Sequence, residues 1–188
     1  MAHPATDAPA TAARDADVRA DEAGRDERSV SAAVVTIARA PQELYDFWRD
    51  FAKLARVMEN IETIEVQDRT RSTWTVKAPA GRTVSWEAVV TDDEPGRLIA
   101  WASVEGAQVR SSGRVEFRDA GERGSVVRAV IAYDPPAGVV GQLVAKLFQR
   151  EPAIQARREL RRFKQLMETG EVSTSARTRA HAAAHTAG

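Results

Sequence analysis

The chain has 188 residues, of which 43% are hydrophobic and 29% are charged, and 27 basic side chains balance 27 acidic ones. This size and composition predict one soluble globular domain with tails, and the balanced charge gives no net attraction to nucleic acid or to an anionic membrane. Cysteine is absent, which excludes disulfides, thiolate nucleophiles and Cys-ligated zinc.

Both ends of the chain lack the residues that build a core. Residues 1–29 contain no aromatic residue, Leu or Ile, and no apolar run suited to a signal peptide. We therefore expect a disordered N-terminal arm and a cytoplasmic protein. Residues 172–188 are rich in Ala, Thr, Ser and Arg and predict a disordered C-terminal tail. The folded domain is predicted to span residues 31–171.

The predicted domain begins with a strand and two short helices. Branched side chains favour a strand over 33–38, because they pack well on a pleated surface. Pro41 marks the first turn of a helix whose apolar residues recur at helical spacing as far as Phe51. A second short helix is expected to continue to Met58.

The middle of the chain alternates between apolar and polar residues. Turn signals rich in Gly, Pro and Asp divide it into six segments, a spacing typical of consecutive antiparallel strands. The expected strands are 61–66, 72–78, 82–92, 98–103, 108–118 and 125–133.

Helical patterns return at the end of the predicted domain. Two prolines, Pro135 and Pro136, stop the last strand because proline has no backbone donor. Apolar residues over 138–149 predict one helix, and Pro152 starts a longer amphipathic helix that stops near Gly170. The apolar stripe of this longer helix is Ala156, Leu160, Phe163 and Met167.

An antiparallel sheet with one apolar face must cover that face, and the long terminal helix is the element best suited to do so. The expected fold is therefore α+β, a seven-stranded curved antiparallel sheet wrapped around a C-terminal helix, with two short helices after the first strand. Small residues interrupt the inner face at Ala88, Ser111, Gly113 and Ala129. They leave space for a cavity, unless Gly113 marks a bulge and the tryptophans fill the gap.

Two stretches of the sequence share a pattern with a known family. The first contains Trp86, Pro95, Ile99-Ala100-Trp101, Gly113, Val115, Phe117 and the run Tyr133-Asp134-Pro135-Pro136-Ala137-Gly138, and the second spans 145–171. They resemble the bacterial polyketide cyclase/dehydrase and lipid-transport family of the START-like (SRPBCC) superfamily. The resemblance covers about residues 33–171 and is most specific toward the C-terminal end.

This resemblance implies a helix-grip fold with a hydrophobic cavity between the sheet and the C-terminal helix. The superfamily uses such cavities for lipids, sterols, polyprenyl quinones and polyketides, but fold analogy does not supply a catalyst. The residues expected to contact a ligand are Trp74, Val84, Trp86, Ala88, Trp101, Ser111, Gly113, Val115, Ala129, Ile131, Tyr133, Leu143, Leu147, Leu160, Phe163 and Met167.

Few residues of the predicted domain suit catalysis. The three histidines, at positions 3, 181 and 185, lie in the tails, so a catalytic triad and a His-ligated metal are excluded from residues 31–171. Tyr133 is a weak candidate for a proton donor and Glu87 for an acid or base, with packing and solvated charge as the alternatives. We expect no metal and no cofactor.

Charged residues elsewhere are interpreted as surface features. Glu59, Glu62 and Glu65 lie near the expected pocket rim but have no partner that the sequence identifies. The basic residues of the last helix, such as Arg162, are interpreted as a solvated face paired with Glu151 and Glu159, and no nucleic acid is expected as a partner.

The apolar residues of 138–149 exceed what one packed face needs. This segment is expected either to pack on the sheet or to act as a lid that touches a membrane transiently, which would make the protein peripheral at the inner membrane.

Three functions fit these residues. The preferred one is binding or transport of a small hydrophobic molecule, with Tyr133 and Ser111 orienting it. The alternative is a polyketide cyclase or dehydrase that acts mainly by positioning a flexible substrate. A protein-interaction module is the third, and it predicts a solid core with an exposed apolar patch.

Overall fold

The computed structural model describes residues 29–78, 81–134 and 152–172. Its elements follow the predicted order of a strand, short helices, six further strands and a long helix. The elements are β1 (Ser29–Ile37), α2 (Pro41–Arg49), η1 (Phe51–Arg56), β2 (Ile61–Val66), β3 (Arg71–Ala78), β4 (Arg82–Glu94), β5 (Leu98–Ser103), β6 (Arg110–Asp119), η3 (Gly121–Arg123), β7 (Ser125–Asp134) and α4 (Pro152–Thr169).

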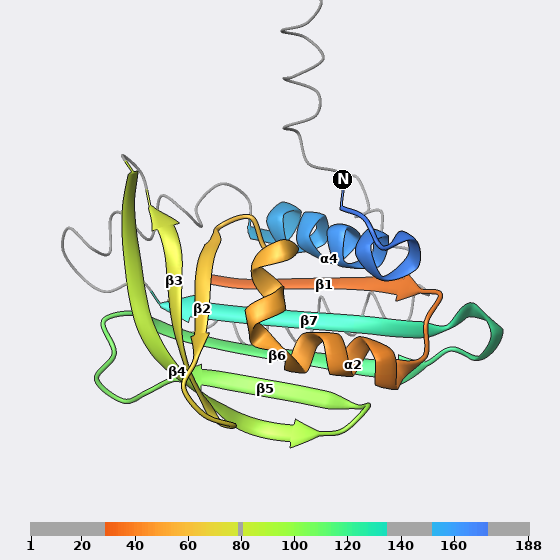
Figure 1. The fold of residues 1–188 in the computed structure, drawn as a ribbon, viewed down its shortest axis with the longest axis horizontal. Coiled ribbons are helices and arrows are strands. Elements are labelled where there is room, and N and C mark those ends of the chain that lie inside the picture. The colour runs from red at the N-terminus through yellow and green to blue at the C-terminus, as the bar shows by residue number, and fades with distance from the viewer. Residues whose placement is uncertain (1–28, 79–80, 135–151, 173–188) are drawn as a thin grey trace, which may run out of the picture.

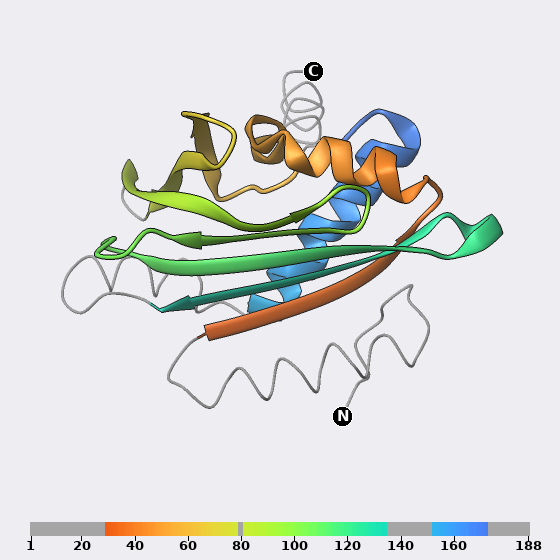
Figure 2. The same cartoon turned by 90° about the horizontal axis from the view of Figure 1, so that it is seen from below.

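The strands form one antiparallel sheet in the order β1-β7-β6-β5-β4-β3-β2. The sheet is curved, and strands β2 to β4 turn away from the direction of the other four (Figure 1). Helices α2 and α4 lie on the same side of it, as the view from below shows (Figure 2). This arrangement confirms the expected α+β helix-grip fold, in which a curved sheet holds a C-terminal helix.

Strand and helix bounds differ from the predicted ones mainly at their ends. β1 begins at Ser29, inside the predicted N-terminal arm, because it pairs with β7 from Ser29–Tyr133 to Ile37–Ser125. The first helix stops at Arg49, and Phe51 belongs to the short 3-10 helix η1. The predicted helix at 138–149, residues 1–28 and residues 173–188 lie outside the described residues.

The inner face of the sheet follows the predicted alternation and forms the core. Ile99, Val115 and Val127 are completely buried there. A register shift in β4 between Val90 and Asp92 changes the alternation, so that Asp93 lies opposite Ile99 on the inner side. This shift brings a carboxylate to the edge of the core.

The outer face carries a network of charged side chains around Glu116, which is only 9% exposed. Arg114 donates from Nε to Glu116 at 2.9 Å, and Arg118 donates to the other carboxylate oxygen at 3.3 Å. Burial would raise the pKa of Glu116, but the hydrogen bond from Arg114 and the charges of Arg128, Arg114 and Arg118 hold it below its usual value. The network therefore favours the ionised carboxylate.

The C-terminal half of α4 is fastened to the end of β1. Lys164 donates from Nζ to the Thr36 carbonyl at 2.8 Å, and the Ala38 amide donates to Glu168 Oε1 at 2.8 Å. The helix runs along β1 in the same direction, so its N-terminal half lies beside the beginning of that strand (Figure 1). These contacts fix which face of α4 points toward the sheet.

Candidate ligand-binding site

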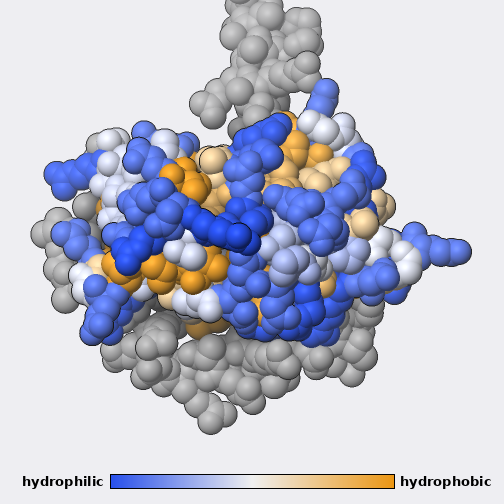
Figure 3. Space-filling model, turned by 60° about the horizontal axis from the view of Figure 1, so that its bottom comes forward, coloured by the Kyte–Doolittle hydropathy of each residue, from blue (hydrophilic) through white to orange (hydrophobic). Residues whose placement is uncertain are grey.

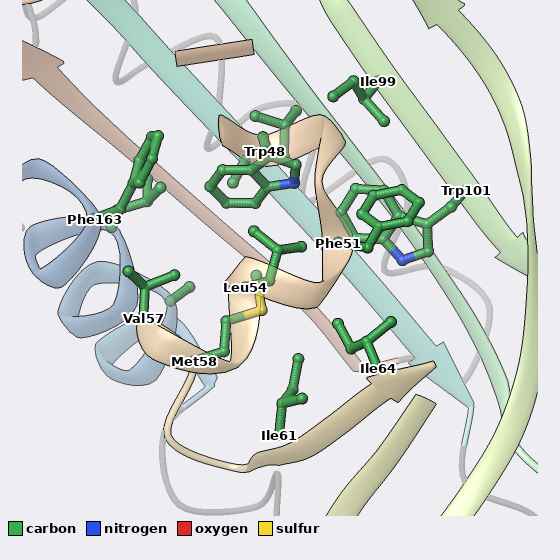
Figure 4. Close-up of a cluster of buried hydrophobic side chains, with 14 of the residues drawn as sticks. Trp48, Phe51, Leu54, Val57, Met58, Ile61, Ile64, Ile99, Trp101 and Phe163 are labelled. Atoms are coloured by element: carbon green, nitrogen blue, oxygen red, sulfur yellow. The ribbon is translucent and has the colours of Figure 1, made fainter. Parts of the chain in front are cut away.

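Aromatic side chains cover the part of the inner face formed by β3, β4 and β5. The Trp74 ring stacks on Trp101 at a centroid distance of 5.7 Å and on Trp86 at 6.5 Å. Phe51 of η1 packs against Trp74 and Trp101 from the helix side, as the close-up shows for Phe51 and Trp101 (Figure 4). Trp74 also donates from Nε1 to Ser72 Oγ at 3.0 Å, which satisfies its buried donor.

Gly113 is required by one of these rings. A Cβ atom at this position would lie 2.2 Å from Cζ2 of Trp101, so any other residue would collide with the indole. β6 pairs with both neighbours without a register shift, so there is no bulge at Gly113. The tryptophan ring fills the space over this glycine.

A second aromatic group joins the helices to the sheet. Trp48 of α2 meets Phe163 of α4 edge to face at 5.1 Å and Phe117 of β6 at 6.4 Å. Phe47 also contacts Phe163, at 5.3 Å. The close-up shows Trp48 between Phe163 on one side and the pair Phe51 and Trp101 on the other (Figure 4). Phe163 therefore contributes to helix packing.

The structure brings most of the expected ligand contacts to the same side of the sheet. The buried ones are Trp74, Val84, Trp86, Ala88, Trp101, Gly113, Val115, Ala129, Leu160 and Phe163. Three more are partly buried: Ser111, Ile131 and Met167. Leu143, Leu147 and the side chain of Tyr133 lie outside the part of the chain that the structure describes.

The remaining polar candidates occupy different environments. Glu87 alternates with the inward Trp86 and Ala88 along β4 and forms an ion pair with Arg71 at 2.8 Å. The structure therefore does not bring Glu87 to the inner face. Glu62 and Glu65 are exposed on β2.

Tyr45 is engaged within the fold. Its hydroxyl donates to Asp93 Oδ1, and Arg49 donates from Nε to Asp93 Oδ2 at 2.9 Å. Burial, together with the hydrogen bond and charge of Asp93, raises the pKa of Tyr45 to about 12. This trio fastens α2 to β4.

Sequence reasoning missed the role of Glu159. Its side chain accepts a hydrogen bond from Gln155 Nε2 at 3.1 Å, and burial raises its pKa to about 7, with a further contribution from the charge of Glu59. The signal was present in the spacing, because Glu159 lies three residues after Ala156 and four before Phe163, both buried. Glu159 is therefore partly buried rather than fully solvated.

Within the described residues, no group of three or more His, Cys, Asp or Glu is arranged to hold a metal ion. Of the helices that the structure describes, none combines the length and apolar character needed to cross a membrane.

Most of the chain, residues 28–168, matches a family model described as polyketide cyclase / dehydrase and lipid transport. The chain belongs to this family. The resemblance drawn from the tryptophan, proline and glycine pattern is thereby confirmed. None of the curated proteins matches the chain.

Several solved structures are similar to this chain. DR_A0006 from Deinococcus radiodurans is 42% identical with a TM-score of 0.63, and the match covers 76% of this chain and 100% of that one. TTHA0849 from Thermus thermophilus is 22% identical with a TM-score of 0.57, covering 73% and 94%. The Zhui aromatase/cyclase from Streptomyces is 15% identical with a TM-score of 0.56, covering 78% and 99%. The last two show the shared fold.

Proposed function

We propose that this protein binds a small hydrophobic molecule, such as a lipid, a polyprenyl quinone or a polyketide-like compound, between the curved sheet and α4. Membership of a family named for polyketide cyclases, dehydrases and lipid transport supports this class of ligand. The buried inner face supplies aromatic and branched side chains, whose desolvation drives apolar binding.

A row of small side chains on the inner face carries the proposal. Ala88 of β4 pairs with Ser103 of β5, whose hydroxyl accepts from the Ser111 amide of β6 at 2.8 Å. Ser111 in turn pairs with Tyr133 of β7. Tyr133 pairs with Ser29, the first residue of β1. The row therefore lies at the end of the sheet where β1 begins, beside the N-terminal half of α4. Alanine and serine fill less volume than the leucine or isoleucine of a solid core, which supports room for a ligand above this row.

A thermal-shift measurement tests this binding. A ligand that binds the folded state raises the melting temperature by mass action, so we expect a fatty acid, a prenyl quinone or an aromatic polyketide to stabilise the wild type. Ser111→Phe fills the row and should abolish the shift. Ser112→Phe is the matched control, because the neighbouring Ser112 is exposed. An absence of any shift, or equal shifts in both variants, would contradict the proposal.

The second candidate function is a polyketide cyclase or dehydrase that works mainly by positioning. The name of the family and the likeness in fold to the Zhui aromatase/cyclase favour it. Turnover of a poly-β-keto substrate that Tyr133→Phe abolishes, while ligand affinity is kept, would establish the enzyme. Ligand binding without turnover would assign the protein to transport or storage.

Surface properties give less support to a protein-interaction module. Among the described residues Val66, 51% exposed, is the one large hydrophobic side chain that is exposed. On the face drawn in Figure 3, hydrophobic patches are separated by hydrophilic residues. A contiguous apolar docking surface would look different.

We also propose a cytoplasmic location with transient membrane contact through 138–149. The apolar composition of this segment supports the membrane contact. Flotation with vesicles that contain anionic lipid tests the contact, and a protein that stays at the bottom of the gradient with every vesicle would contradict it.

A further inference from the structure

Four polar side chains meet where α4 faces the turn between η1 and β2. Gln155, Glu159 and Arg162 come from α4, and Glu59 comes from the turn. Arg162 forms an ion pair with Glu59 and donates to the Arg56 carbonyl at 3.4 Å. This ion pair joins α4 to the turn before β2, the edge strand at the other end of the sheet from β1.

Glu159 lies at the edge of the buried face of α4 and is partly exposed. Ala156, Phe163 and Leu166 are spaced three, four and seven residues from it, and all three are buried. The fastening of the C-terminal half of α4 to β1 fixes this orientation. Glu159 lies near the middle of α4, just inside its N-terminal half.

Burial, more than the surrounding charges, favours the protonated form of the Glu159 carboxyl group. Burial is the largest influence and raises the pKa to about 7, the charge of Glu59 raises it further, and Gln155 and Arg162 lower it. Arg162 is engaged by Glu59, so its positive charge is already shared. Near neutral pH a large share of the molecules carry a protonated Glu159, which is a hydrogen-bond donor.

Arg162 adds a second available donor. Its Nε–H is buried, and no described residue accepts a hydrogen bond from it. An unsatisfied buried donor is costly, so such groups commonly indicate a missing acceptor. A donor pair of this kind at the edge of an apolar face is suited to one acceptor oxygen.

We propose that Glu159 and Arg162, supported by Gln155, form a polar subsite that binds a carbonyl oxygen of the hydrophobic ligand. This subsite rests on the proposed ligand-binding function and specifies the ligand class further. The ligand is an apolar molecule with a ketone, quinone or ester carbonyl, and a plain hydrocarbon lacks the group that the subsite recognises. Ionisation of Glu159 replaces the donor by a negative charge, which repels the carbonyl oxygen and weakens binding.

Calorimetric titration with two matched probes tests the subsite. Menadione is 2-methyl-1,4-naphthoquinone, and 2-methylnaphthalene has the same carbon skeleton without the two carbonyl oxygens. A hydrogen bond to a buried donor corresponds to about a tenfold change in affinity. We expect the wild type to prefer menadione by about this factor at pH 6 and to lose most of the preference at pH 8.5.

Two variants and a control separate the subsite from general packing. Glu159→Gln keeps an amide donor and should preserve the menadione preference at both pH values, whereas Glu159→Ala should lose it at pH 6. Glu122→Gln makes the same change at an exposed position of η3 and should behave as wild type. Affinity for 2-methylnaphthalene should stay the same in all proteins.

Failure of the subsite and failure of hydrophobic binding give different results. A wild type that binds both probes equally at pH 6, or a Glu159→Ala protein that keeps the pH-dependent preference, would overturn the subsite and leave hydrophobic binding intact. A wild type that binds neither probe would count against the proposed function itself, and the subsite would fall with it.

Discussion

Replacement of Glu159 by Gln should stabilise the protein at alkaline pH and leave it almost unchanged in acid. The folded state raises the pKa of Glu159 from the ordinary 4.5 to about 7. Between these two values the folded protein holds a proton that the unfolded chain has released, so stability falls as the pH rises. Above pH 7 the loss of stability from ionised Glu159 is fully present, and below pH 4.5 it is absent.

The size of the effect follows from the same two values. Each unit of difference between the two pKa values corresponds to about 1.4 kcal/mol, so the loss in the free energy of unfolding has an upper limit of about 3 kcal/mol. Glu159 is partly exposed, and water screens part of its charge, so we expect about 2 kcal/mol. Glutamine is neutral at every pH and keeps the shape of the side chain, so the variant avoids this penalty.

Urea denaturation at pH 4 and pH 8 measures the difference directly. Glu159→Gln should have the free energy of unfolding of the wild type at pH 4 and exceed it at pH 8, while the exposed Glu122→Gln control should follow the wild type throughout. A gain that is the same at both pH values, or a loss at pH 8, would refute the reasoning that burial disfavours the ionised carboxyl.

Three further changes test the packing and the charge networks. Gly113→Ala should destabilise the fold by about 1–3 kcal/mol, because the added Cβ collides with Trp101. The fluorescence emission of Trp101 should also shift. Unchanged stability and emission would contradict the close contact. Asp93→Asn removes a hydrogen-bonded negative charge, so the pKa of Tyr45 should fall from about 12 in an absorbance titration, and an unmoved value would sink the assignment. Glu116→Gln should lower the free energy of unfolding at pH 7 by about 1–2 kcal/mol. Because the arginines stabilise the ionised form, this loss should shrink as the pH drops below the ordinary carboxyl range. Thermal melts across this pH range measure the change.

Elements with sharp boundary signals were predictable from the sequence. β2 and β5 have the predicted bounds, because clear alternation and turn residues enclose them. The start of β1 was missed, since its first residues are small and its strand character comes from pairing with β7, a partner distant in the chain. The predicted helix was also too long, because Asp50 leaves the helical conformation and the chain continues as η1.

The candidate site was predictable as a face but not as a set of contacts. Alternation alone placed Trp74, Trp86 and Trp101 on the inner side, and all three are buried there. That Trp101 lies on Gly113 depends on the register of β5 with β6, which no local pattern encodes. Glu159 was missed because its charge suggested solvent, although its spacing from Ala156 and Phe163 matches the buried stripe.

Native mass spectrometry of the full chain, purified without denaturant, tests the central proposal most directly. We expect the wild type and Ser112→Phe to carry a noncovalent hydrophobic adduct that gentle collisional activation releases, and Ser111→Phe to appear as the bare polypeptide. An adduct that persists in Ser111→Phe, or a wild type that is bare even after incubation with fatty acids, quinones and aromatic polyketides, would contradict a ligand site between the sheet and α4.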